Sequence, residues 1–209
     1  MNETSEIRIL VVEDHPIVRF GLATFLDSQE GMTVVGEAET GEQSVAMSQA
    51  DPPDLVVMDL QLPGISGVEA IARIRRQSPK TRFVVLTTYE GDEDIHRALE
   101  AGARAYLIKG MPLDSLADAV RKVHAGGRVL PTPVADTLSA WTPNSELTPR
   151  ERDVLALIVE GKSNRKIAEQ LAIAEGTVKC HVNVIFRRLD VTGRAEAAAV
   201  ALRRGIVHL

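Results

Sequence analysis

Short apolar runs alternate with longer amphipathic segments along the first 125 residues of the chain. The apolar runs are four to six residues long and rich in Val, Ile and Leu, and they lie at 7–12, 32–35, 55–58, 83–86 and 105–108. Strands that are apolar along their whole length and separated by helices are typical of a parallel sheet covered on both faces. The pattern therefore predicts a doubly wound (βα)5 α/β domain with a five-stranded parallel sheet.

The segments between these runs carry apolar residues at helical spacing. In the segment after the first run these residues include Ile17, Phe20, Gly21, Thr24 and Phe25. In the segment after the third run they include Val68, Ile71, Ala72 and Ile74. A last helix is expected from Pro112 to about Ala125, where Gly126-Gly127 would end it.

From Leu147 onward the pattern is purely helical and predicts a small all-α domain of four helices. Thr148-Pro149 would start the first helix, which would end at Gly161, and Ser163 would cap the second. Between the two patterns, residues 126–146 hold prolines, a short possible helix at about 134–140 and Trp141. We therefore predict domains at 1–125 and 147–209, joined by a linker at 126–146.

The third helix of the second domain has two distinct faces. Its apolar stripe is predicted at Val178, Val182, Ile185 and Leu189, widened by Phe186. Its outward face is predicted at Gly176, Lys179, Cys180, Asn183 and Arg187, with no acidic residue up to Arg188. The basic residues Lys162, Arg165 and Lys166 lie nearby in the preceding helix pair. A solvated surface helix would give the same pattern, but this helix pair and these charges favour insertion into a DNA major groove.

The net charge of −5 hides an uneven distribution of charge. Residues 146–209 hold 11 basic and 8 acidic residues, a charge of +3, which leaves −8 for the rest of the 209-residue chain. The single cysteine excludes an internal disulfide framework and favours a reducing cytoplasm. No apolar run approaches the roughly 18 residues that span a bilayer, and no secretory signal precedes the first strand, so we expect a cytoplasmic protein without a membrane partner.

Polar side chains follow four of the five predicted strands. Glu13-Asp14 follow the first, Asp59 the third, Thr87 the fourth and Lys109 the fifth. Because the carboxyl ends of parallel strands share one edge, these groups are expected to converge there. Clustered carboxylates suit Mg²⁺, and beside such an ion Asp59 can act as a nucleophile toward phosphorus and form an acyl phosphate. Lys109 and Thr87 would then contact the phosphoryl oxygens.

Each of these residues alone has an ordinary structural interpretation, since an Asp after a strand often caps a helix and a lone Lys is often solvated. An aspartyl-phosphate hydrolase is an alternative, but such enzymes usually need a second acid two residues after the nucleophile, and Gln61 stands there. A nucleotide-binding enzyme is a weaker alternative, because no Gly-rich phosphate loop follows the first strand. We therefore favour a phosphoacceptor that is not an enzyme.

Residues 7 to about 125 resemble the receiver domain of two-component response regulators. The motifs VVEDHPIVRFGL, VVMDLQLPGISG, VVLTTYEGDEDI and GARAYLIKG match in order and spacing, and Lys109-Gly110 is common in the NarL/FixJ subfamily. By this resemblance Asp59 is the phosphorylation site, and Asp14, Glu13 through water, and the Gln61 carbonyl would complete the Mg²⁺ site. Thr87 and Tyr106 would be the switch pair.

Gln61 and Tyr89 occupy the positions that tune the phosphate lifetime in this family. We hypothesise that the bulky Tyr89 hinders the attacking water, so a Tyr89→Ala variant would dephosphorylate faster. An unchanged or longer lifetime of the aspartyl phosphate would reject this hypothesis.

The segment from about Leu147 to Val207 is similar to the LuxR-type helix-turn-helix domain, on LTPRERDVLALIVEGKSNRKIAEQLAIAEGTVKCHV and RRLDVTGRAEAAAVAL. The resemblance implies DNA contacts from Thr177 and Lys179, with the Cys180 and Asn183 positions facing the bases. Ala174 stands where the family often has a capping serine. Such domains typically dimerise through their last helix, here Arg194 to Gly205.

Together these features indicate a NarL/FixJ-type regulator of transcription. A sensor histidine kinase would phosphorylate Asp59, and the homodimer so formed would bind promoter DNA, with RNA polymerase as a further candidate partner. The remaining alternative is a regulator controlled without phosphorylation. The presence of the complete set of phosphorylation-site residues argues against it: Glu13, Asp14, Asp59, Thr87 and Lys109.

Overall fold

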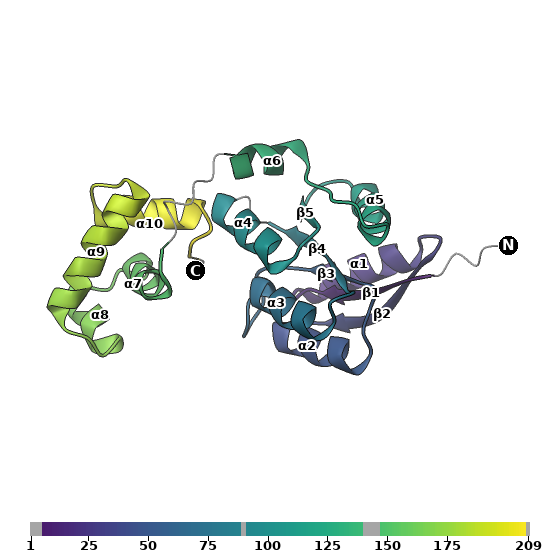
Figure 1. Ribbon diagram of the computed structural model, residues 1–209, viewed down its shortest axis with the longest axis horizontal. Coiled ribbons are helices and arrows are strands. Elements are labelled where there is room, and N and C mark those ends of the chain that lie inside the picture. Colours follow the sequence, from purple (N-terminus) through teal and green to yellow (C-terminus); the bar gives the residue numbers. More distant parts are fainter. Residues whose placement is uncertain (1–5, 89–90, 140–146, 208–209) are drawn as a thin grey trace. The chain divides into compact units, whose positions relative to one another are not determined.

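The computed structural model describes residues 6–88, 91–139 and 147–207, which form two compact units (Figure 1). The first unit contains the sheet with α1–α3, α5 and most of α4, and the second contains α7–α10. Within these residues, none of the helices has the length and apolar character that a membrane span requires. Tyr89 and Trp141 lie outside the described residues.

The first unit is built on five parallel strands. Their bounds are β1 Ile7–Val12, β2 Met32–Ala38, β3 Leu55–Met58, β4 Arg82–Thr87 and β5 Ala105–Ile108. Their order across the sheet is β2-β1-β3-β4-β5, and every neighbouring pair is parallel. The predicted doubly wound fold is confirmed.

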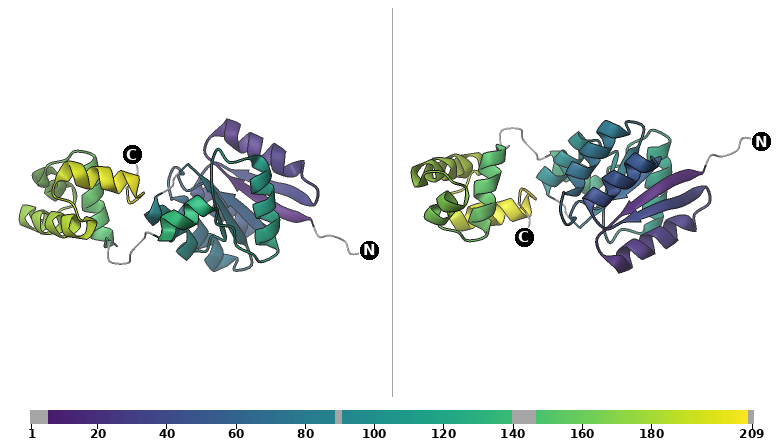
Figure 2. Two further views of the ribbon diagram at one scale, coloured as in Figure 1. Left: turned by 90° about the horizontal axis from the view of Figure 1, so that it is seen from above. Right: turned by 90° about the horizontal axis from the view of Figure 1, so that it is seen from below.

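Helices cover both faces of this sheet (Figure 2). Their bounds are α1 Pro16–Asp27, α2 Gly41–Ala50, α3 Gly67–Gln77, α4 Asp92–Ala101 and α5 Leu113–His124. Alternate strand residues such as Ile9, Val57 and Leu107 pack in one core with Leu26 of α1 and Val120 of α5. Because successive side chains of a strand point to opposite faces, the other half of the buried strand residues faces the layer of α2, α3 and α4.

The helical spacing predicted a helix here but did not identify the buried face of α1. Ile17 is 88% and Phe20 68% exposed, whereas Leu22, Ala23 and Leu26 are buried. The sequence of α1 is apolar on more than one side, so helical spacing alone fits two orientations of the helix. Packing against the sheet selects the side that carries Leu22 and Leu26.

Strand β2 is longer and less buried than predicted. It continues to Ala38, beyond the apolar run 32–35, and only its two end residues are fully buried. As the edge strand it pairs with β1 alone, so one long side of it is free of strand neighbours. An edge strand can carry polar residues such as Thr33 and Glu37. The prediction missed them because it assumed strands that are apolar along their whole length.

The second unit is a bundle of short helices. The bounds are α6 Thr132–Ser139, which spans the boundary of the two units, then α7 Pro149–Val159, α8 Asn164–Gln170, α9 Glu175–Leu189 and α10 Arg194–Arg203. The buried stripe of α9 is Val178, Val182, Ile185 and Leu189, as predicted. These side chains share one core with residues of α7, α8 and α10.

Local signals set the ends of these helices. Thr148 and Glu151 form a capping box at the start of α7, and Ser163 accepts a hydrogen bond from Lys166 N at 3.4 Å. Ala174 provides no side-chain cap for α9. The predicted helix starts at Thr148 and Ser163 are therefore confirmed.

Candidate functional site

Four strand ends place polar side chains at one edge of the sheet. Glu13 and Thr87 are fully buried and Asp59 is only 5% exposed, although each follows or ends an apolar strand. A buried carboxylate is costly unless a cation or hydrogen-bond donors compensate it. The groups that contact Glu13 and Asp59 therefore indicate which kind of ligand this edge of the sheet can bind.

Lys109 supplies the compensating charge. Its Nζ lies 2.7 Å from Asp59 Oδ2 and 2.6 Å from Glu13 Oε2. Burial lowers the pKa of Lys109, but the hydrogen bond to Asp59 and the adjacent carboxylates of Asp59 and Glu13 outweigh it and hold that pKa above its ordinary value. The ammonium group is thus fixed in its charged form between two carboxylates that are far apart in the sequence.

Backbone contacts hold Asp59 at the rim of the sheet. Its N–H donates to the Val12 carbonyl at 3.0 Å, and its Oδ1 accepts from Gln61 N at 3.3 Å. The first residue of α3, Gly67, lies so close that a Cβ there would be 2.0 Å from the Asp59 carbonyl oxygen. A glycine at position 67 is therefore required for α3 to begin directly beside Asp59.

The donors at this edge fit a hard divalent cation. Glu13, Asp14 and His15 offer ligand atoms within 4.8 Å of one another. Glu13 Oε2 and Asp14 Oδ1 are buried oxygens without a well-directed hydrogen bond, although Lys109 Nζ and His15 Nδ1 lie within 2.6 and 2.7 Å of them. Buried carboxylate oxygens with spare acceptor capacity are the ligands that Mg²⁺ and similar ions prefer.

His15 and Arg19 belong to this cluster but were not among the predicted site residues. His15 Nδ1 lies 2.7 Å from Asp14 Oδ1 and 3.1 Å from Glu13 Oε1, and the charge of Asp14 raises the pKa of His15. Arg19 Nη1 donates to the Glu13 carbonyl at 2.7 Å. This contact depends on where α1 begins relative to the end of β1, so the sequence pattern gave no signal for it.

Thr87 and Tyr106 lie on neighbouring strands and face the same side of the sheet. In the register of β4 and β5, Val85 pairs with Tyr106, and Thr87 is two residues beyond Val85. Residues two apart along a strand point to the same face. Both side chains are fully buried, so Tyr106 occupies an inward position. Tyr89, predicted to tune the phosphate lifetime, lies outside the described residues.

The outward face of α9 is exposed as predicted. The exposed residues of this face are Gly176, Thr177, Lys179, Cys180, Asn183 and Arg187. The short α8 precedes it through a turn in which Ala172 adopts a positive φ of 53°. Two helices joined by such a tight turn are the arrangement of a helix-turn-helix motif.

The expectation that this face has no acidic residue is wrong. Glu175 Oε1 lies 3.1 Å from Lys179 Nζ, an i,i+4 pair in the first turns of α9. Arg165 and Lys162 also have acidic neighbours, at 3.1 Å from Glu169 and 3.6 Å from Glu160. Among the described residues, Lys166 and Arg187 form no ion pair.

The fold and the acidic edge together define a receiver unit followed by a helix-turn-helix unit. Comparison with protein families agrees: residues 9–121 match the response regulator receiver domain, and residues 145–201 match the bacterial regulatory proteins of the luxR family. Both families are families of regulatory proteins.

Whole-length relatives share this arrangement. The transcriptional regulatory protein LiaR of Bacillus subtilis is 38% identical over 97% of this chain and 100% of its own length. The nitrate/nitrite response regulator protein NarL of Escherichia coli is 39% identical over 95% of this chain and 96% of its own. The chain therefore belongs to the NarL/FixJ family of response regulators, transcription regulators with a receiver domain and a LuxR-type DNA-binding domain.

Solved structures show the same fold. The response regulator ChrA of a heme-sensing two-component system is 36% identical, with a TM-score of 0.57 over 97% of this chain and 99% of that one. RcsB of Salmonella enterica serovar Typhimurium, bound to a promoter in the presence of the phosphomimetic BeF3⁻, is 25% identical, with a TM-score of 0.69 over 93% and 97% of the two chains.

Proposed function

We propose that Asp59 accepts a phosphoryl group from a sensor histidine kinase and that this modification controls DNA binding by the second domain. The observation that carries the proposal is the position of Lys109. Its Nζ lies 2.7 Å from Asp59 Oδ2 and 2.6 Å from Glu13 Oε2. An ammonium group fixed there can contact an oxygen of a phosphoryl group on Asp59. The domain boundaries 1–125, 126–146 and 147–209 and a cytoplasmic location are part of the same proposal.

Mg²⁺ would be held by Asp14 and Asp59, by the Gln61 carbonyl and, through water, by Glu13. Bound there, the ion would neutralise charge that develops during phosphoryl transfer. The residues of this chain do the rest: Asp59 provides the nucleophilic oxygen, and Lys109 orients and balances the new charge. Thr87 and Tyr106 would change position in response, as the switch pair.

The expected consequence is a shift between two populations of the molecule. In the resting population the protein does not form the dimer that binds DNA, and phosphorylation favours the dimer. The exposed face of α9, with Thr177, Lys179, Cys180 and Asn183, would enter the major groove. The basic residues Lys162, Arg165, Lys166 and Arg187 would contact phosphates or bases. Promoter DNA, a second copy of the chain and RNA polymerase are the proposed partners after the kinase.

The intact mass of the protein tests the first step. Wild type and Asp59→Asn are incubated with Mg²⁺ and acetyl phosphate, with Asp118→Asn as the control because the Asp118 side chain is 80% exposed. We expect one phosphoryl adduct on the wild type and the control, and none on Asp59→Asn or without Mg²⁺. An adduct that persists in Asp59→Asn, or its absence from wild type after rapid cold trapping, contradicts the assignment.

A further inference from the structure

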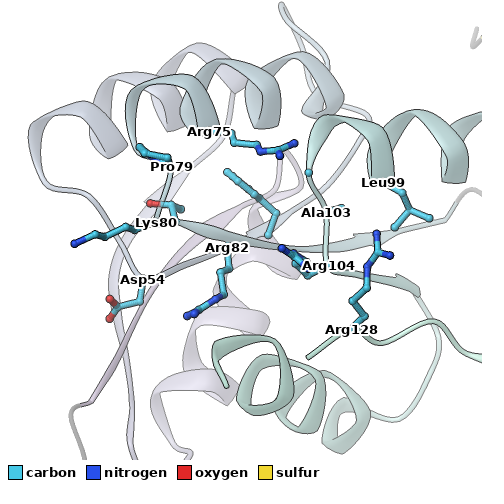
Figure 3. A pocket seen from close by; sticks show the side chains of 12 residues that line it. Asp54, Arg75, Pro79, Lys80, Arg82, Leu99, Ala103, Arg104 and Arg128 are labelled. Atoms are coloured by element: carbon cyan, nitrogen blue, oxygen red, sulfur yellow. The ribbon is translucent and has the colours of Figure 1, made fainter. Parts of the chain in front are cut away.

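Besides the acidic cluster around Asp59, the receiver unit has a basic hollow at the opposite edge of the sheet. It has a volume of about 670 Å³, within the range of small-molecule sites (Figure 3). The amino ends of three strands contribute to it: Asp54 precedes β3, Arg82 begins β4 and Arg104 precedes β5. The same three strands end at Asp59, Thr87 and Lys109, so the hollow and the acidic cluster lie at opposite ends of β3, β4 and β5.

The charge of this hollow is strongly unbalanced. Five cationic side chains line it: Arg75, Lys80, Arg82, Arg104 and Arg128. The one carboxylate in the lining, Asp54, already accepts a hydrogen bond from Arg8 N at 3.0 Å.

Most of these cations lack a partner. In the ranges 6–88, 91–139 and 147–207, the side chains of Lys80, Arg82, Arg104 and Arg128 make no hydrogen bond or ion pair, and Arg75 reaches only the carbonyls at the end of α4. Several like charges around one concave surface repel each other and attract anions.

The walls of the hollow are fixed by the fold. Arg82 N donates to the Asp54 carbonyl at 3.0 Å, and the buried Thr81 Oγ1 donates to the Pro53 carbonyl at 2.8 Å. Val129 N donates to the Arg104 carbonyl at 2.9 Å, which holds the neighbouring Arg128 beside the start of β5.

Gly102 keeps this wall open beside Arg75. Its φ is +127°, and a Cβ there would lie 2.7 Å from Arg75 Cδ. A side chain at position 102 would therefore displace Arg75, and glycine leaves room for it. The cations are consequently presented by a preformed surface.

We propose that this hollow binds a small organic polyphosphate of the nucleoside di- or triphosphate class. Guanidinium groups match phosphate oxygens with paired hydrogen bonds, and several cations require a ligand with several negative charges. The partly or fully exposed Leu99 and Pro79 in the lining offer apolar surface to the organic part of the ligand. A nucleic-acid backbone fits less well, since it is contacted by an extended basic stripe rather than by a compact hollow.

Calorimetric titration of the full-length protein with guanosine triphosphate, adenosine triphosphate or inorganic phosphate tests this proposal. Mg²⁺ is removed with a chelator, so that the acidic cluster cannot recruit the ligand through a metal ion. We expect a triphosphate to bind wild type at least tenfold more tightly than inorganic phosphate. The double variant Arg104→Gln/Arg128→Gln should lose at least tenfold in affinity, because two cations of the hollow are removed.

Arg76→Gln is the matched control, since Arg76 is an exposed arginine of α3 next to Arg75 but does not line the hollow. It should bind within about twofold of wild type, and so should Asp59→Asn, because the proposal does not depend on the phosphoacceptor. Lys80→Gln, a single change at an exposed position, provides a second weakened variant if the double variant does not fold.

Three outcomes would overturn the proposal. The first is no triphosphate binding at millimolar concentration, and the second is equal affinity of the hollow variants and Arg76→Gln. The third is that duplex DNA of unrelated sequence displaces the triphosphate from the hollow and that the hollow variants also lose affinity for this DNA. That result would make the surface a nucleic-acid contact.

Discussion

At the residue scale, Lys109 controls the charge of the acidic cluster. Its Nζ lies 2.6 Å from Glu13 Oε2 and 2.7 Å from Asp59 Oδ2, and both carboxylates belong to the proposed metal site. A unit charge at about 5 Å contributes about 1–3 kcal/mol at the effective dielectric constants of partly buried sites. Lys109→Ala should therefore bind Mg²⁺ roughly tenfold more tightly than wild type, as measured by calorimetric titration.

The control for this variant is Lys122→Ala, which removes an exposed lysine of α5. Its Mg²⁺ affinity should equal that of wild type. If Lys109→Ala binds Mg²⁺ more weakly than wild type, the ammonium group supports the metal site instead of competing with the ion.

Gly67 is a second single-residue determinant of the site. A Cβ at this position would lie 2.0 Å from the Asp59 carbonyl oxygen and 2.8 Å from Leu60 Cα, and both are backbone atoms that cannot move independently. Gly67→Ala should therefore destabilise the protein by about 1–3 kcal/mol, the usual cost of overpacking. Urea unfolding measures the effect.

Gly21→Ala provides the comparison. Gly21 lies within α1, is exposed and has open space where an added Cβ would lie, so alanine should stabilise the helix by about 0.5–1 kcal/mol. A Gly67→Ala variant as stable as Gly21→Ala would show that α3 can shift away from Asp59 without cost.

At the element scale, the start of α10 depends on the ionisation of Glu196. Its Oε2 accepts hydrogen bonds from Thr192 N at 2.8 Å and Thr192 Oγ1 at 2.9 Å. The backbone hydrogen bond from Thr192 is the main cause that lowers the pKa of Glu196 in the folded protein. A carboxyl group with a depressed folded pKa stabilises the protein above its unfolded pKa, and this contribution is lost as the pH falls through the folded value.

Glu196→Gln should accordingly have a lower melting temperature than wild type at pH 7. The difference should shrink as the pH is lowered below about 4.3, the ordinary value for glutamate. Melting curves of both proteins over this pH range measure the difference. A gap that stays constant, or widens in acid, contradicts the role of the ionised carboxylate.

The buried stripe of α9 was predicted correctly, whereas the sequence pattern did not identify the buried face of α1 or the edge position of β2. The stripe of α9 is apolar on one side only, so its period also fixed its orientation. In α1 the exposed Ile17 and Phe20 compete with Leu22 and Leu26, and only packing on the sheet decides between them. Likewise, the position of β2 at the sheet edge depends on which strands pair with each other, and its local sequence pattern carries no information about that pairing.

The same limit applies to the candidate site. The side chains of Glu13, Asp59 and Lys109 could be expected together because strand ends in a parallel sheet meet at one edge. The cationic hollow could not, since it depends on which loops lie side by side. The Glu175–Lys179 pair, four residues apart in one helix, could have been expected from its spacing and was missed. Charges that lie between elements were thus harder to anticipate than residues at the ends of strands.

At the scale of the whole molecule, the proposed switch must connect Asp59 with a dimer of the second unit. Helix α10 offers a surface for this contact, because its exposed residues Ala195 and Ala199 are small and Leu202 is 38% exposed. These three residues lie at i, i+4 and i+7 and share one face of the helix. Small side chains on such a face allow two helices to approach closely.

Ala199→Arg should separate phosphorylation from dimer formation. Treated with acetyl phosphate and Mg²⁺, this variant should take up one phosphoryl group but remain a monomer, because arginine adds bulk and like charges to the two-fold contact. Wild type should form a dimer in sedimentation velocity and bind promoter DNA at least tenfold more tightly than before treatment, and Asp59→Asn should do neither. Because a dimer engages two half-sites at once, the DNA affinity of phosphorylated Ala199→Arg should stay at the untreated level. If it instead dimerises and binds like wild type, the contact between the two copies lies elsewhere than on this face of α10.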